Sequence, residues 1–136
     1  MNLEIDQYCF ACGRENPIGL KLRFELSTEG VTAYFTPSRE HQGFAGILHG
    51  GIISTLLDEA MAHAVIAGGR LAVTARMELA FKKPTLTGEE ITLKGRVIRE
   101  DKKIIKASAE IEQKGVITAS ATAVFIVLPE KNQRFK

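Results

Sequence analysis

Two kinds of catalytic group occur on one predicted helix of this chain. His49-Gly50-Gly51 opens the helix, and Asp58 follows on the same otherwise apolar stretch. The first turn of a helix presents unpaired backbone N–H groups and a partial positive charge, which suit a developing oxyanion. A carboxylate among apolar side chains is costly to hold, so we interpret Asp58 as a functional acid.

One copy of this helix cannot bring both groups to the same substrate atom. Gly50 and Asp58 are eight residues apart, which is roughly 12 Å of helical rise. In two helices that run antiparallel across a twofold axis, Asp58 of one would face the Gly50 and Gly51 amides of the other. The sequence therefore predicts two equivalent sites across a homodimer interface.

The surrounding pattern predicts the elements that position these groups. Apolar residues recur at helical spacing over 51–67, and Gly68-Gly69 provides a stop. Alternation predicts a hairpin over 20–26 and 31–35, a loop over 37–48, and strands over 70–83, 90–100, 103–113 and 116–128. Short turn-like joins indicate that the later strands form an antiparallel meander. We expect an α+β fold in which a long antiparallel sheet wraps around one central helix.

Length and composition bound the class of protein. With 136 residues and 45% hydrophobic content, we expect one domain over 1–136, with an N-terminal segment over 1–19 and a frayed tail over 130–136. The 18 basic and 16 acidic residues nearly balance, which argues against nucleic acid or an anionic membrane as partner. We recognise no export pattern and no membrane-spanning apolar run, so we expect a soluble cytoplasmic protein.

A set of motifs extends over most of the chain. It comprises His49-Gly50-Gly51 with Asp58 nine positions after the histidine, Thr74 ten positions before Pro84 in the strand ending Phe81-Lys82-Lys83-Pro84, and the N-terminal sequences Cys9-Phe10-Ala11-Cys12-Gly13 and Asn16-Pro17-Ile18-Gly19-Leu20. Together these motifs resemble hotdog-fold acyl-CoA thioesterases, and within them the PaaI-like branch. The resemblance implies hydrolysis of an acyl-CoA thioester without cofactor or metal, in a homodimer that is often a dimer of dimers.

The resemblance also implies a role for each residue of the motif. The amide of Gly50, with that of Gly51, would bind the thioester oxygen as it becomes an oxyanion. Asp58 of the neighbouring subunit would act as general base on water or as a nucleophile that forms a mixed anhydride. Thr74 would hydrogen-bond the water or Asp58, and His49 would orient the loop or the carbonyl.

One position departs from the family pattern. Relatives often carry Asn or Gln six residues before the histidine, where this chain has Gly43, with Gln42 one position earlier. Either Gln42 substitutes after a loop adjustment, or the helix N-terminus carries more of the oxyanion stabilisation. The basic residues Arg76, Lys82 and Lys83 are expected to receive the phosphates of coenzyme A.

Two other functions compete with hydrolysis. Glu59 and His63 on the same helix resemble the helix of acyl-carrier-protein dehydratases, but the histidine and proline context of those enzymes is missing around His41. A non-catalytic acyl-CoA-binding dimer is the other alternative, suggested by Gly43. On the helical wheel Asp58 groups with small residues and Glu59 does not, so Glu59 is interpreted as structural.

Cys9 and Cys12 have the two-residue spacing of metal or redox pairs. The chain has no second cysteine pair, and no strand is predicted ahead of the motif as a redox fold requires. We therefore expect the two cysteines to pack the N-terminal segment near the substrate tunnel.

Overall fold

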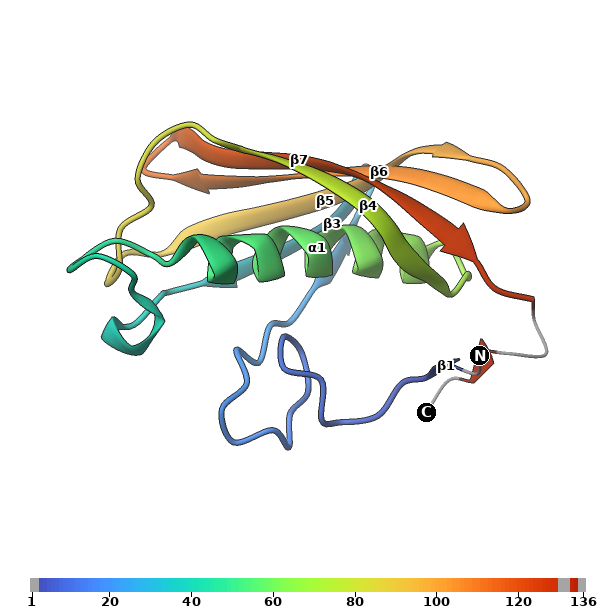
Figure 1. Ribbon diagram of the computed structural model, residues 1–136, viewed down its shortest axis with the longest axis horizontal. Helices are drawn as coiled ribbons and strands as arrows, with labels where there is room; N and C mark the ends of the chain where they lie inside the picture. The colour runs from blue at the N-terminus through green and yellow to red at the C-terminus, as the bar shows by residue number, and fades with distance from the viewer. Residues whose placement is uncertain (1–2, 130–132, 135–136) are drawn as a thin grey trace.

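A computed structural model describes residues 3–129 and 133–134 (Figure 1). In chain order, the helices and strands of the described residues are β1 (Leu3–Glu4), β2 (Glu25–Ser27), β3 (Gly30–Phe35), a 3-10 helix (Arg39–His41), α1 (Gly50–Ala67), β4 (Ala72–Phe81), β5 (Ile91–Glu100), β6 (Ile104–Gln113), β7 (Val116–Val127) and β8 (Gln133–Arg134). The predicted helix and the four predicted long strands are confirmed, each within two residues of its expected ends.

A six-stranded antiparallel sheet in the order β2-β3-β5-β6-β7-β4 dominates the structure. The sheet curves over α1, which lies lengthwise along one of its faces (Figure 1). The N-terminal segment passes on the other side of the helix and contributes Ala11, Leu20 and Leu22 to the same apolar core. The expected architecture, a long antiparallel sheet around one central helix, is confirmed.

Small side chains on the sheet allow the helix to lie close to it. The residues of β6 and β7 that face α1 are mostly alanines, and all are buried: Ala107, Ala109, Ala119, Ala121 and Ala123. The helix fills the space with large side chains, among them Leu56, Leu57 and Met61, none of which is exposed to solvent. Burying such side chains contributes roughly 1.5–3 kcal/mol each.

The predicted first hairpin is partly wrong. Its second strand is confirmed as β3, but its first strand forms only over β2, and residues 20–24 lie outside the sheet. Leu20 and Leu22 donate their amides to Phe10 and Ala11 of the N-terminal segment. The alternation of residues 20–24 therefore reflects side chains that dip into the core from a loop that covers the helix.

The predicted meander is also corrected. β5, β6 and β7 follow one another, but β4 pairs with β7 at the far edge of the sheet and not with β5. The connection over 82–90 therefore crosses one end of the sheet. Buried Gln113 holds it there, because its side chain bonds the amide and carbonyl of Leu86 and the carbonyl of Glu89.

By length and composition alone, the helix α1 is long and apolar enough to cross a membrane. It has 18 residues of sufficient mean hydropathy, which differs from the expectation that no such run exists. Ile53, Leu56, Leu57, Ala60, Met61, Ala64 and Val65 of the helix are buried. The same length and composition are found in a helix that forms the core of a domain.

The expected frayed tail over 130–136 falls mostly outside the described residues. The described part of it is Gln133–Arg134, which forms β8 and pairs in parallel with β1. At this point the two ends of the described chain lie together (Figure 1).

Gly95 marks the closest approach of the sheet to the helix, and its substitution tests this packing. A Cβ atom at Gly95 would lie 2.3 Å from the carbonyl oxygen of Ala60, so Gly95→Ala must push the helix away from the sheet. We expect it to lower the free energy of unfolding by about 1–3 kcal/mol or more, measured by urea denaturation. Gly68→Ala is the control, because there the nearest atom is 3.4 Å away and no positive φ is required. Equal stability of the two variants would contradict this account of the core.

Candidate functional site

Asp58 and Thr74 form the centre of the candidate site. The Thr74 hydroxyl donates a hydrogen bond of 2.8 Å to Oδ1 of Asp58. Asp58 projects from the middle of α1 towards β4, where it is half-buried. Burial raises the pKa of the Asp58 carboxyl above its ordinary value, the bond from Thr74 partly offsets this, and the neighbouring Glu59 adds to the rise. The site therefore holds a carboxylate that is more basic than an exposed aspartate.

A β-bulge in β4 aims Thr74 at the helix. Thr74 pairs with Phe125 and Arg76 pairs with Val124, which leaves Ala75 as an extra residue. Side chains alternate along a strand, so without the bulge Thr74 would share the outer face with Arg76. The bulge turns Thr74 to the face of the buried Phe125 and of Asp58.

The first turn of α1 has one open amide among the described residues. The amides of Ile52 and Ile53 donate to the carbonyl of His49. The Gly51 amide donates to Nδ1 of His49 at 2.8 Å, as in a helix cap. The Gly50 amide has no acceptor within the described part of the chain, so of the two amides predicted to bind an oxyanion, Gly50 alone is available. His49 is the acceptor through Nδ1, so its neutral ring carries the proton on Nε2.

Two backbone contacts fix the loop that precedes the helix. The His49 amide donates to the carbonyl of His41 at 3.0 Å, and the Leu48 amide donates to the carbonyl of buried Thr85 at 2.8 Å. The loop is thus held against the connection that follows β4, and the Gly50 amide has a defined position. Beside it lies Phe81 at the end of β4, close enough to contact a Cβ atom at Gly50 at 3.7 Å.

Gln42 and Gly43 lie in this loop next to His49. Oε1 of Gln42 accepts the amide of Gly46 at 3.1 Å, so the oxygen of this side chain stabilises the loop itself. A Cβ atom at Gly43 would contact His49 at 3.4 Å, which places the residue 43 position beside the helix cap. The side-chain NH2 group of Gln42 can still donate a hydrogen bond to another acceptor.

The three predicted phosphate-binding residues do not lie together. Lys82 and Lys83 are exposed directly after β4, where both amides bond the carbonyl of Thr118. They follow Phe81 and therefore lie at the end of the helix that carries Gly50. Arg76 lies on the outer face of the sheet, since its partner Val124 faces away from the helix. In this chain Arg76 is on the opposite face from Asp58.

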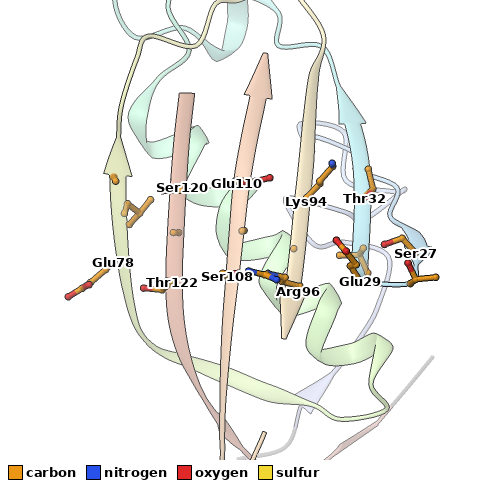
Figure 2. Close-up of a pocket in the computed structure, with 18 residues that line it drawn as sticks. Ser27, Glu29, Thr32, Glu78, Lys94, Arg96, Ser108, Glu110, Ser120 and Thr122 are labelled. Atoms are coloured by element: carbon orange, nitrogen blue, oxygen red, sulfur yellow. Dashed lines mark hydrogen bonds between the residues drawn. The ribbon is translucent and has the colours of Figure 1, made fainter. Parts of the chain in front are cut away.

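A hollow of about 700 Å³ lies on the outer face of the sheet, away from Asp58 (Figure 2). Side chains of both charges line it, including Glu29, Glu78, Lys94, Arg96 and Glu110. None of the residues that line it is among those singled out for catalysis. We place the candidate site at Asp58 and not in this hollow. The side of the sheet that faces α1 combines a carboxylate with a raised pKa, a hydrogen-bond donor to that carboxylate and an open helix terminus, and the hollow does not.

Glu59 points to a different neighbour from Asp58. Its Oε2 lies 3.3 Å from Nε2 of His63 and 3.5 Å from Sγ of Cys9. Burial would raise the pKa of Glu59, but hydrogen bonds from His63, Cys12 and Cys9 lower it overall. A catalytic acid of the dehydratase kind needs access to substrate, so this engaged carboxylate does not favour that alternative. The predicted structural role of Glu59 agrees with these contacts.

The model of the family described as Thioesterase superfamily matches residues 45–120 of this chain. Acyl-coenzyme A thioesterase 13 of Homo sapiens is 30% identical over 77 residues, which are 55% of each protein. The chain spans about half the length, or less, of the curated relatives it matches.

Solved structures of the same superfamily share the fold. A thioesterase superfamily protein superposes with a TM-score of 0.83 at 28% identity, over 88% of this chain and 63% of that one. A hypothetical thioesterase of Streptococcus pneumoniae solved with coenzyme A gives a TM-score of 0.74 at 22% identity, over 79% and 85% of the two chains. Since the family model covers more than half of the sequence, and the hotdog arrangement of sheet and helix agrees with it, this chain belongs to the thioesterase superfamily.

Proposed function

We propose that this protein hydrolyses acyl-CoA thioesters to a free acid and coenzyme A. The observation that carries the proposal is the half-buried Asp58 carboxylate, bonded to Thr74, on a helix whose first amide is open. Two of the relatives are named acyl-coenzyme A thioesterases, which supports the substrate class. The PaaI-like branch and a cytoplasmic location remain part of the same proposal.

In the general-base form of the mechanism, Asp58 takes a proton from water as the water oxygen attacks the thioester carbon. The carbonyl oxygen becomes an oxyanion, which the Gly50 amide and the positive end of α1 stabilise. The C–S bond then breaks, and the coenzyme A sulfur leaves with the proton that Asp58 returns. The raised pKa of Asp58 supports this form, because it makes the carboxylate a stronger base.

In the nucleophilic form, a carboxylate oxygen of Asp58 attacks the thioester carbon itself. The C–S bond breaks to give a mixed anhydride between Asp58 and the acyl group, and coenzyme A leaves as a thiolate. Water then hydrolyses the anhydride to the free acid and the Asp58 carboxylate, and a proton released in this step converts the thiolate to the thiol. Thr74 has the same part in both forms. Its hydroxyl holds Oδ1 and leaves Oδ2 to face the substrate.

The proposed site is shared between two subunits. Along one helix the Gly50 amide and Asp58 are separated by roughly 12 Å, which is too far for one substrate carbonyl. Within the described residues β4 has a strand partner on one side only, and Phe81 at its end is 57% exposed. Ten-residue edge strands with exposed apolar ends favour pairing with another chain. A homodimer, and a dimer of dimers built from it, is therefore part of the proposal.

Coenzyme A is proposed to bind with its phosphates near Lys82 and Lys83. These two cations lie at the same end of α1 as Gly50, and the solved pneumococcal thioesterase was crystallised with coenzyme A. Two further forms of that protein replace an aspartate and a threonine by alanine, 16 positions apart, the separation of Asp58 and Thr74. This agreement supports the assignment of the pair to the site. Arg76 joins the phosphate site only if the partner subunit brings it there.

Replacement of the carboxylate tests the reaction. Asp58→Asn should abolish release of free thiol across a panel of acyl-CoAs, followed with a thiol-detecting reagent. The melting temperature at neutral pH should not fall, because the pKa of Asp58 is raised in the folded state and the charged form therefore costs stability as pH rises through it.

Asp101→Asn, in the exposed turn between β5 and β6, is the matched control and should keep the wild-type rate. If the wild type is stabilised by acyl-CoAs but releases no thiol from any of them, the non-catalytic binding dimer is the correct function.

The pH profile tests the bond between Thr74 and Asp58. A general base must be deprotonated, so kcat should fall as the pH decreases through the pKa of Asp58. The Thr74 hydroxyl lowers that pKa, so Thr74→Val should move the acidic limb of the kcat profile to higher pH. Thr122→Val, on the outer face of the neighbouring strand, should leave the limb in place. An unchanged limb in Thr74→Val would contradict the assigned role.

A proline at position 50 removes the open amide with little other change. Proline is favoured at the first position of a helix, and His49 has φ −61° and ψ 136°, a conformation compatible with a following proline. Gly50→Pro should lower kcat about 10²–10³-fold, whereas Gly50→Ala, which keeps the amide, should lower it far less. Equal losses in the two variants would show that the amide is not the oxyanion donor.

The same variant tests whether the site is shared. In a mixed dimer of Gly50→Pro and Asp58→Asn chains, one of the two sites contains both native groups. Refolding the two impaired proteins together should therefore raise thiol release well above that of either protein refolded alone. Failure of the mixture to regain activity, with mixed dimers shown by native mass spectrometry, would place the two groups of each site in one subunit.

A further inference from the structure

A second polar cluster lies on the side of α1 that the N-terminal segment covers. Cys9 and Cys12 come from that segment, and Glu59 and His63 come from one turn of the helix. The sulfur atoms of both cysteines and a Glu59 oxygen all lie within 4.8 Å of one another. The N-terminal segment in this region runs beside the helix and opposite the sheet (Figure 1). None of these four residues takes part in the proposed hydrolysis.

The backbone around the two cysteines forms a tight knuckle. The Gly13 amide donates to the carbonyl of Cys9 at 2.8 Å, and the Cys12 amide donates to Sγ of Cys9 at 3.4 Å. A Cβ atom at Gly13 would lie 2.4 Å from the Cys9 nitrogen, so only glycine allows the turn. The turn therefore brings the two sulfur atoms to one side.

Three donor atoms of the cluster, from Cys9, Cys12 and Glu59, lie close enough together to share one zinc ion. Zinc bonds of about 2.3 Å to sulfur and 2.0–2.2 Å to nitrogen or oxygen place neighbouring ligand atoms about 3.3–3.8 Å apart. The Cys9 sulfur lies 3.5 Å from Oε2 of Glu59, and Nε2 of His63 lies 3.3 Å from the same oxygen. His63 is outside the group of atoms that lie within 4.8 Å of one another, so its ring would move towards the sulfur atoms to become the fourth ligand. We propose that Cys9, Cys12, Glu59 and His63 bind a structural zinc ion that joins the N-terminal segment to α1.

The donor set selects the kind of metal. Two thiolates, one imidazole and one carboxylate suit a borderline-soft divalent ion such as zinc, and do not suit magnesium or calcium, which take oxygen ligands. With four protein ligands the coordination sphere is closed, which is typical of a structural site.

The surroundings of the cluster also fit a structural site. The ring of Phe24 stacks on His63 with centroids 4.4 Å apart, which fixes the plane of the imidazole. The side chains of His63 and Glu59 are only 27% and 17% exposed. Partial burial of this kind shields a bound metal ion from solvent.

A zinc ion here would connect residues that are far apart in sequence. Cys9 and Glu59 are separated by 50 positions, so the ion would close a long loop and restrict the unfolded chain. It would also fix the helix directly beside Asp58, although no catalytic step uses the ion. The cluster therefore has a function different from that of the thioesterase site on the other side of the helix.

Metal analysis of the whole protein tests the proposal. Purified without a polyhistidine tag, the protein should contain one zinc ion per chain by mass spectrometry of its metals, and its cysteines should react with a thiol reagent only after a chelator is added. Cobalt(II) substituted for zinc should give the charge-transfer absorption of thiolate ligands. Chelation should lower the melting temperature, and added zinc should restore it.

Variants of one sulfur and one nitrogen ligand complete the test. Cys12→Ser and His63→Ala should each weaken zinc binding at least tenfold, while His41→Ala, at a half-buried histidine of the 3-10 helix outside the cluster, should bind zinc as the wild type does. Asp58→Asn should also keep its zinc while it loses thiol release, which separates this proposal from the proposed hydrolysis.

The proposal is overturned by any of three results. These are a wild-type protein that neither contains zinc nor takes it up, a Cys9–Cys12 disulfide in the freshly purified chain, or wild-type zinc affinity in either ligand variant.

Discussion

The close contact between α1 and the sheet is the constraint on which the rest of this structure depends. At Gly95 the two layers approach until no side-chain atom fits between them, and the alanines of β6 and β7 keep the surface low along the rest of the helix. A helix held this closely cannot rotate about its axis. Each of its side chains therefore has fixed neighbours, and these neighbours determine its chemistry.

The two adjacent acidic residues of α1 show this effect. Successive residues of a helix are turned by about 100°, so Asp58 points to β4 and Glu59 points to the N-terminal segment. Asp58 meets one hydroxyl and keeps a raised pKa, whereas Glu59 meets an imidazole and two sulfur groups and has a lowered one. One carboxylate is thereby suited to accept protons and the other to bind cationic partners. The difference arises from the surroundings of each residue and not from its type.

Sequence patterns predicted the elements well and the contacts between distant elements poorly. The helix and long strands were predictable because their apolar periodicity is local. The bulge at Ala75 was not, because no glycine or proline marks it, and it decides that Thr74 faces the helix. The occupation of the Gly51 amide by His49 was equally hidden, since it depends on a side-chain rotamer. Both features alter the candidate site without altering any motif.

The second cluster was missed for a related reason. Cys9 and Cys12 were set aside because the chain has no second cysteine pair. The helix supplies the remaining proposed ligands, Glu59 and, four positions later, His63. Only the folded structure brings this turn of the helix next to the cysteines of the N-terminal segment. The signal in the sequence is the pair Glu59 and His63, whose four-residue spacing places both side chains on one face of the helix. It becomes informative once the N-terminal segment is known to cover that face.

The proposed division of the catalytic site between subunits follows from the same rigidity. Because α1 is fixed by the sheet, Asp58 cannot move along it towards Gly50. Two hydrogen bonds that hold residues in place form within one chain. Thr74 donates to Asp58, and the Gly51 amide donates to His49 at the helix cap. The groups that must act together lie at opposite ends of a half-helix next to the open edge of β4. In the proposed mechanism, such a chain positions each reactive group by itself, and a second copy would combine them.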